Sequence, residues 1–192
     1  MNLKEKQDRL KFEKINKLCK GRILNLGSSN LRNDYDLHSF LKEQGHEIVS
    51  VGLKDSDINL DLNREDWGLL ETYDTVLASE IIEHLDSPKK FIRNCYEYLN
   101  KGGRFILSTP NATSLIYLYN PNWCVGYDPI CFQDNTHNLA LTSGMLVFRL
   151  GRVGFKNINS EYLNCFIENP LAYIITKMFS RLRGDILIWG DK

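Results

Sequence analysis

Two carboxylates and an imidazole fall within five residues, directly after an apolar segment. Glu80, Glu83 and His84 follow residues 75–78, which read Thr-Val-Leu-Ala. If Glu80 opens a helical turn, Glu83 and His84 come three and four residues later, so the three side chains share one face. The imidazole can take up a proton near neutral pH, because the ordinary pKa of histidine is about 6.5. The plainer interpretation is a solvated helix start, where the helix dipole favours carboxylates.

Short apolar segments around this group predict the strands of a sheet. They cover residues 22–26, 47–51, 58–62, 73–79, 104–108, 155–162 and 185–189. Helical patterns cover residues 3–19, 34–44, 88–99, 142–153 and 170–183. Strands that alternate with helices form a parallel sheet with helices packed against it. Ligands bind such sheets at the carboxyl ends of the strands, which is where Glu80 would lie.

Several local signals add detail to this outline. Thr142 and Gly154 are typical of the two ends of a helix, and Asn63 with Asp66 predicts a short capped helix. We expect helix 3–19 to cover one edge of the sheet. Segment 170–183 is expected to pack on the domain or on a partner such as a second copy in a homodimer, because three basic residues are few for membrane contact.

Composition limits the classes of function. The 192 residues suit a single domain, 1–192, and 24 basic residues balance 24 acidic ones, which argues against general nucleic-acid binding. Five cysteines without a C-x-x-C pair favour neither a disulfide framework nor a zinc site. With no signal peptide and no transmembrane segment in the sequence, we expect a soluble, cytoplasmic protein.

Four motifs carry a resemblance to a known family. They are residues 23–27 (ILNLG), 73–85 (YDTVLASEIIEHL), 99–104 (LNKGGR) and 108–111 (STPN). Their order and spacing resemble class I S-adenosylmethionine-dependent methyltransferases, in the branch of ubiquinone-type and small-RNA O-methyltransferases. The resemblance covers 22–162 and leaves 163–192 as an extra helix and closing strand. It implies an α/β, Rossmann-like doubly wound, mostly parallel seven-stranded sheet with helices on both faces.

The resemblance also implies positions that bind S-adenosylmethionine. The glycine-rich turn corresponds to Asn25, Gly27, Ser28 and Ser29, the adenine contacts to Asp61 and Leu62, and the strand end facing the methionine part to Ser79 and Glu80. Gly27 as a turn glycine and Asp61 as an exposed acid are the alternative interpretations.

Two positions depart from the pattern of the family. Asn25 replaces an acid, and Gly52 stands where an acid normally holds the ribose, with Asp55 and Asp57 nearby. We therefore expect weak cofactor binding, because a lost charged hydrogen bond lowers affinity about ten- to a hundredfold.

A sulfonium methyl group is already activated, so the protein must orient the acceptor and remove its proton. In the branch named above, an E-x-x-E-H turn and a later histidine bind a divalent metal. The matching residues here are Glu80, Glu83, His84 and His137, the last in a long aromatic segment, 109–140, that is typical of a lid or substrate wall. Without a metal, His84 or His137 would be the general base.

Two functions remain. The first is O-methylation of a small-molecule, sugar or lipid-linked acceptor, with S-adenosylmethionine as cofactor. The second is a non-catalytic methyltransferase-like protein that binds a partner. A nicotinamide-dependent oxidoreductase is excluded, because residues 27–32 do not read G-x-G-x-x-G.

Overall fold

The computed structural model describes residues 3–28, 36–119, 137–163 and 170–192. Its strands form one seven-stranded sheet in the order β3-β2-β1-β4-β5-β7-β6. The strands are β1 (Ile23–Leu26), β2 (Ile48–Gly52), β3 (Ile58–Asn59), β4 (Tyr73–Ser79), β5 (Leu99–Pro110), β6 (Lys156–Leu163) and β7 (Asp185–Asp191). β1 to β5 are parallel, whereas β7 runs antiparallel to both β5 and β6. The predicted doubly wound, mostly parallel sheet is confirmed.

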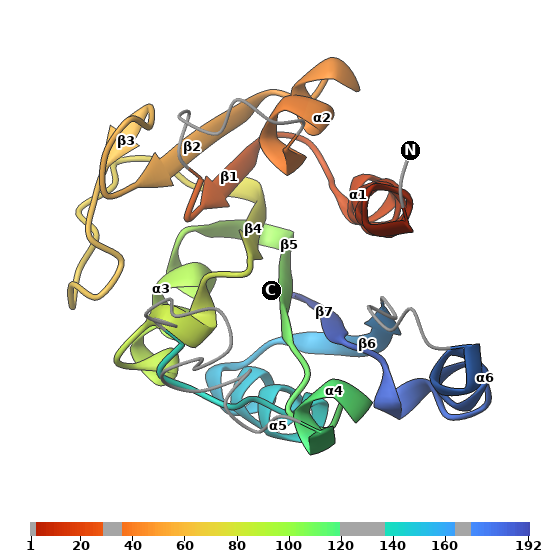
Figure 1. Ribbon diagram of the computed structural model, residues 1–192. Helices are drawn as coiled ribbons and strands as arrows, with labels where there is room; N and C mark the ends of the chain where they lie inside the picture. Colours follow the sequence, from red (N-terminus) through yellow and green to blue (C-terminus); the bar gives the residue numbers. More distant parts are fainter. Residues whose placement is uncertain (1–2, 29–35, 120–136, 164–169) are drawn as a thin grey trace.

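Helices cover both faces of this sheet (Figure 1). α1 (Leu3–Leu18) and α2 (Leu37–Glu43) pack on one face, where Ile15 and Leu41 join a buried cluster with Leu77, Ile106 and Leu187. α1 therefore covers a face, and the expectation that it covers an edge is wrong, because its apolar stripe contacts the central strands.

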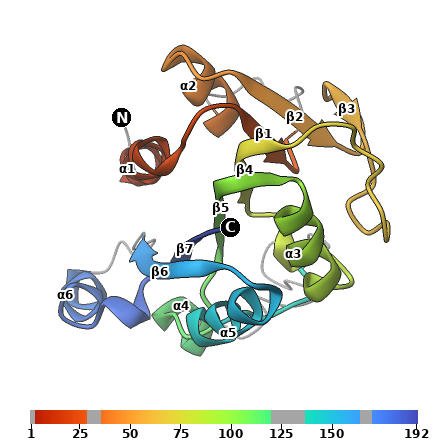
Figure 2. The same cartoon turned by 180° about the vertical axis from the view of Figure 1, so that it is seen from behind.

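The opposite face is covered by α3 (Pro88–Glu97) and α5 (Ser143–Val153), as Figure 2 shows from behind. Phe91 and Ile92 of α3 and Leu146 and Leu150 of α5 are buried in the larger core cluster. Successive strand residues point to opposite faces, so each central strand supplies both clusters. The chain also forms the short helices η1 (Ile82–His84), α4 (Leu115–Tyr119), α6 (Pro170–Met178) and η3 (Ser180–Leu182).

The helix-end signals gave one correct and one wrong prediction. Thr142 caps α5 by accepting a hydrogen bond from the Met145 backbone N–H, and Gly154 ends it with φ +119°. The short helix predicted at Asn63 is absent, since residues 62–65 form a turn and a bend. The Asn63 side chain instead accepts a hydrogen bond from the backbone N–H of Asp86, 2.9 Å away, which ties this turn to the segment after β4.

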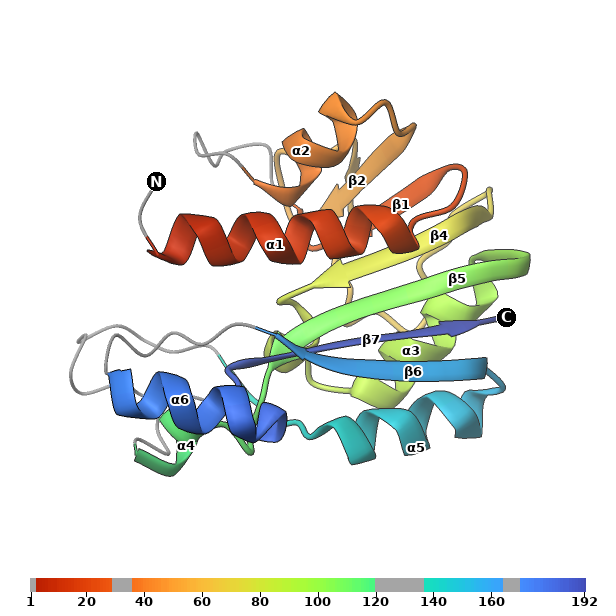
Figure 3. The same cartoon turned by 90° about the vertical axis from the view of Figure 1, so that its right-hand side faces the viewer.

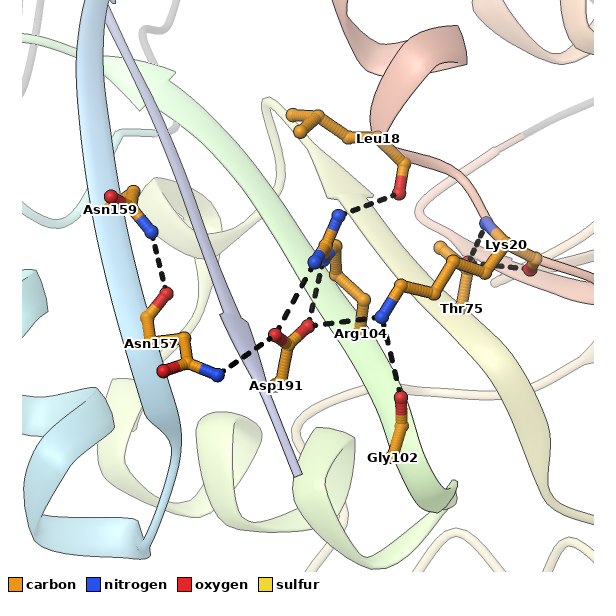
Figure 4. A network of polar contacts seen from close by, with 8 residues as sticks. All are labelled: Leu18, Lys20, Thr75, Gly102, Arg104, Asn157, Asn159 and Asp191. Atoms are coloured by element: carbon orange, nitrogen blue, oxygen red, sulfur yellow. Dashed lines mark hydrogen bonds and ion pairs between the residues drawn. The ribbon is translucent and has the colours of Figure 1, made fainter.

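A polar network fastens the end of α1 to the amino edge of the sheet (Figure 4). The Thr75 hydroxyl both accepts from the Lys20 backbone N–H and donates to its carbonyl, each at 2.8 Å. Arg104 of β5 donates to both carboxylate oxygens of Asp191 on β7, and this hydrogen bonding holds the pKa of Asp191 below its ordinary value. Lys20 also reaches Asp191, at 3.4 Å. The C-terminal end of α1 is thus fixed at the edge of the sheet opposite the carboxyl ends of the parallel strands.

Candidate functional site

The chain changes direction sharply where β4 ends. Glu80 adopts a left-handed conformation with φ +52°, and a single 3-10 turn, η1, follows at Ile82–His84. The prediction that Glu80 opens a helical turn is therefore wrong. Glu80 and Glu83 do not share a helix face, and their carboxylates enter two different sets of contacts. A positive φ is uncommon for residues other than glycine and is found at sites that the surrounding structure holds in place.

The carboxylate of Glu83 is buried at the centre of the site. The residue is 1% exposed, and its Oε2 accepts a hydrogen bond of 2.9 Å from the Thr109 hydroxyl on β5. Among the described residues its Oε1 has no hydrogen-bond partner. Burial, followed by the negative charge of Glu80, raises the pKa of Glu83 to about 8. A protonated acid or a bound cation would each satisfy such a group.

Two imidazoles lie beside Glu83, that of the next residue, His84, and that of His137 from a distant part of the chain. The rings of His84 and His137 meet edge to face, with centroids 4.6 Å apart. Asn138 anchors the approaching segment, because its backbone N–H donates to the Glu83 carbonyl at 2.7 Å and its side-chain amide to the His84 carbonyl at 3.0 Å. One ligand atom each from Glu83, His84 and His137 lies within 4.8 Å of the others. This donor set suits a divalent ion after a small inward movement.

Glu80 belongs to a second polar cluster beside the first. Its Oε1 accepts from Lys11 of α1 at 2.5 Å and from the Ser108 hydroxyl at 2.8 Å. Ser108 also lies 2.9 Å from the hydroxyl of Ser79, and Lys11 reaches Asp185 of β7 at 3.3 Å. Although burial alone would lower it, these two ion pairs hold the pKa of Lys11 above its ordinary value. Glu80 is thus fixed at the carboxyl end of β4.

Sequence reasoning missed Lys11, Asp185 and Thr109. In an amphipathic helix rich in charges, Lys11 reads as one of several solvated lysines, and no local pattern distinguishes it. Thr109 did carry a signal, since it lies within the STPN motif at residues 108–111. The pairing of β5 with β4 places that motif beside the end of β4.

The end of β1 presents fewer polar groups. Asn25 is nearly buried, and its amide lies 3.5 Å from Nδ1 of His38 on α2. Gly27 has φ +78°, and an added Cβ would lie 2.8 Å from the Ile81 side chain, so a glycine is required here for both reasons. The Ser28 carbonyl accepts from the Ser56 hydroxyl at 2.6 Å, and Ser29 lies outside the described residues.

The structure leaves no room at Gly52 for the ribose-binding acid that the family normally has at this position. A Cβ on Gly52 would lie 2.6 Å from both the Ser28 carbonyl oxygen and the Ser56 hydroxyl. Asp57 is engaged elsewhere: its Oδ2 accepts from the backbone N–H and hydroxyl of Ser50, which hold its pKa below the ordinary value. Asp55 is exposed with φ +56° just beyond β2. Of these two acids, Asp55 is therefore the one whose carboxylate can meet a ligand at the end of β2.

The two predicted adenine contacts lie after β3. Asp61 is exposed, and its Oδ1 accepts from the Asn63 backbone N–H at 2.9 Å, as in a local turn. The Leu62 side chain is buried in the core, so only its backbone can face a ligand. Its carbonyl accepts from the indole of Trp67 at 3.4 Å. The aromatic segment predicted as a lid or substrate wall is 109–140, and its residues 120–136 lie outside the described residues.

Comparison with known proteins shows which protein family this chain matches. Residues 7–160 match the family described as "Methyltransferase domain". The mitochondrial ubiquinone biosynthesis O-methyltransferase of Rattus norvegicus is 42% identical over 48 residues, which are 25% of this chain but only 14% of that protein.

Solved structures are similar to this chain over nearly its whole length. A SAM-dependent methyltransferase from Archaeoglobus fulgidus superposes with a TM-score of 0.66 at 19% identity, covering 96% of this chain and 94% of that one. A Burkholderia thailandensis 1,6-didemethyltoxoflavin-N1-methyltransferase with bound S-adenosylhomocysteine gives 0.60 at 12% identity, covering 95% and 76%. At these identities the likeness concerns the fold.

Proposed function

Because this chain belongs to the methyltransferase domain family, we propose that it transfers the methyl group of S-adenosylmethionine to a hydroxyl of a small-molecule, sugar or lipid-linked acceptor. The observation that carries the proposal is the convergence of Glu83, His84 and His137 beside the end of β4. Their ligand atoms come from two segments more than fifty residues apart in the sequence, and Asn138 fixes one segment to the other.

We assign cofactor binding and proton removal to residues at different ends of the site. The groups at the ends of β1 and β2, Asn25 and Asp55, would hold the cofactor, and Glu80 would face its methionine part. His84 or His137 would take the proton of the acceptor hydroxyl, for which a neutral imidazole is suited. Since the methyl donor is already activated, orientation and proton removal are the main tasks left to the protein.

The resemblance to the ubiquinone-type branch also implies a divalent ion, and the donor set would fit one. Glu83, His84 and His137 would hold it, because the buried Oε1 of Glu83 otherwise lacks a partner among the described residues. When bound, the ion would coordinate the acceptor hydroxyl and lower the pKa of its proton. Without the ion, the same histidines can still orient the hydroxyl and accept its proton.

The second candidate, a non-catalytic binding protein of the same fold, is favoured by the closed position at Gly52. Titration calorimetry with S-adenosylhomocysteine separates the two. We expect binding with a dissociation constant on the order of tens to hundreds of micromolar. This is the affinity expected of a typical cofactor site that has lost one charged hydrogen bond. Asp55→Asn should weaken it about tenfold or more.

Asp57→Asn is the matched control, because Asp57 bonds to Ser50 of the protein. It should lower thermal stability and leave ligand affinity unchanged. No binding of either S-adenosylmethionine or S-adenosylhomocysteine at millimolar concentration, with a native circular dichroism spectrum, would reject the catalytic function.

Thermal melts test the metal. We expect the melting temperature of the wild type to rise with Mn²⁺, Mg²⁺ or Zn²⁺ concentration, because a ligand that prefers the folded state stabilises it by mass action. Glu83→Gln and His137→Ala should each remove most of that rise, since each removes one ligand from the same group. His46→Ala is the control, because His46 lies 2.6 Å from Asn16, in another part of the molecule. A flat response in the wild type would remove the metal from the mechanism.

A further inference from the structure

Helices α4 and α6 together present an apolar surface. Its members are Leu118, Leu171, Tyr173, Ile174, Met178 and Phe179, each between 49% and 72% exposed. The two helices lie side by side (Figure 1 and Figure 3). The hydroxyl of Thr113, just before α4, donates to the Arg181 carbonyl in η3 at 3.1 Å, and so does the Asn111 amide at 2.8 Å. We call these six residues the α4–α6 surface. Their exposure contradicts the expectation that those of segment 170–183 pack on the domain, and it leaves a partner or a membrane surface to cover them. The small number of basic residues argues against a membrane, but the sequence alone does not show this exposed apolar area.

The charged side chains of the two described segments that form this surface have one sign. Residues 110–119 contain no charged side chain, and residues 170–184 contain three basic and no acidic ones, in a chain whose charges balance overall. Lys177 and Arg181 are exposed, and neither forms an ion pair with a carboxylate of the described residues. Arg183 instead donates to the carbonyls of Thr176 and Tyr162. The apolar residues are thus bordered by two available cations.

The α4–α6 surface lies at the catalytic edge of the sheet. β5 runs directly into the segment that bears α4, and Figure 3 shows α4 and α6 at the end where β4 and β5 finish. Glu80 and Thr109, at the ends of those two strands, contact the site residues described above. A molecule held against this surface would therefore be close to the proposed acceptor position.

We propose that the α4–α6 surface binds the surface of an anionic lipid bilayer. Exposed leucine, isoleucine, methionine and phenylalanine side chains enter the boundary between head groups and acyl chains, while Lys177 and Arg181 meet the lipid phosphates. No helix among the described residues is long and apolar enough to cross a membrane, so the contact is interfacial. The proposal rests on the proposed function in one respect, because it selects the lipid-linked acceptor among those named there.

Vesicle co-sedimentation tests the proposal on the intact chain. We expect the wild type to sediment with vesicles of three parts phosphatidylcholine and one part phosphatidylglycerol, and much less with phosphatidylcholine alone. Ile174→Ser/Met178→Ser should abolish binding. Lys177→Gln/Arg181→Gln should weaken it roughly twenty-five-fold at low salt, since each charge contributes about fivefold.

Matched controls share the chemistry but lie elsewhere. Leu53→Ser/Leu70→Ser removes two apolar side chains that are at least as exposed, and Lys54→Gln/Lys101→Gln removes two exposed charges. Both should bind like the wild type. Failure of the wild type to bind anionic vesicles, or equal losses in the controls, would overturn the proposal.

Two further measurements separate the remaining explanations. One outcome of sedimentation velocity would be a dimer that the Ile174→Ser/Met178→Ser variant no longer forms. If the wild type then also fails to bind vesicles, the surface joins two copies of the chain and the membrane proposal is wrong. Calorimetry with S-adenosylhomocysteine on the same samples distinguishes the two proposals. Intact cofactor binding without vesicle binding rejects only the membrane surface, whereas lost cofactor binding in the wild type rejects the catalytic function.

Discussion

Replacing Glu83 with glutamine is expected to stabilise the metal-free protein at pH 8 and to change its stability little below pH 4.5. The folded protein raises the pKa of this carboxyl from 4.5 to about 8. Between those values the unfolded chain releases the proton while the folded protein keeps it. The free energy of unfolding therefore falls as pH rises through this range, and the loss remains above pH 8.

The size of this loss follows from the shift. At 1.36 kcal/mol for each unit of pKa, the shift corresponds to a loss of at most about 5 kcal/mol. Glutamine carries no charge to bury and can still accept from the Thr109 hydroxyl. The neighbouring charges are those of Glu80 and Lys11, which act on the pKa of Glu83 in opposite directions. The imidazoles of His84 and His137 are the other titratable groups beside it.

Urea denaturation in a chelating buffer between pH 4.5 and 8.5 measures the effect. The wild type should lose stability across the range, and Glu83→Gln should follow a flatter curve. Glu97→Gln, at an exposed position of α3, is the control and should follow the wild type. Parallel curves for wild type and Glu83→Gln would show that Glu83 is ionised in the folded protein at all these pH values.

Lys11→Met is expected to lower the free energy of unfolding by about 3–5 kcal/mol, because it removes the buried cation that pairs with two carboxylates. Lys11 is 6% exposed, and its ammonium contacts Glu80 and the nearly buried Asp185. The cost arises mainly at Asp185, since the Glu80 side chain is 36% exposed. The double variant Lys11→Met/Asp185→Asn should therefore recover a large part of the loss.

Lys14→Met provides a control on the same helix. Lys14 pairs with Glu161, but both side chains are about 40% exposed, so the pair contributes less than about 1 kcal/mol. Urea denaturation at pH 7 compares the variants. Equal costs at positions 11 and 14 would contradict the assignment of Lys11 as the buried link between α1 and the end of β4.

The fold was largely predictable because its signals are local. Thr142 and Gly154 mark the ends of α5 through hydrogen bonds and a backbone angle that depend on neighbouring residues alone. The alternation of apolar strands with helices predicted the sheet for the same reason. The Asn63 signal failed because a distant backbone N–H, that of Asp86, competes for the same side chain. No local pattern records that competition.

The candidate site was predictable only in part. The sequence predicted that His137 would approach Glu83 and His84, because the ends of parallel strands and their loops converge, and the structure brings the three together. It did not predict the separation of Glu80 from Glu83, which depends on the left-handed turn at Glu80. Nor did it predict the contact of Lys11 with Asp185, 174 residues apart, because only the folded sheet brings them together.

The position of β7 in the sheet has a consequence for how the chain folds. In the described sheet β6 pairs with β7 alone, and β7 lies between it and β5. During synthesis, β6 therefore emerges before the strand that joins it to the rest of the sheet. Until residues 185–191 arrive, β5 and β6 each present an open row of backbone donors and acceptors, the kind of edge that pairs with other chains. A nascent chain stalled before Asp185 should be prone to aggregation, even though most of its core residues have already been made.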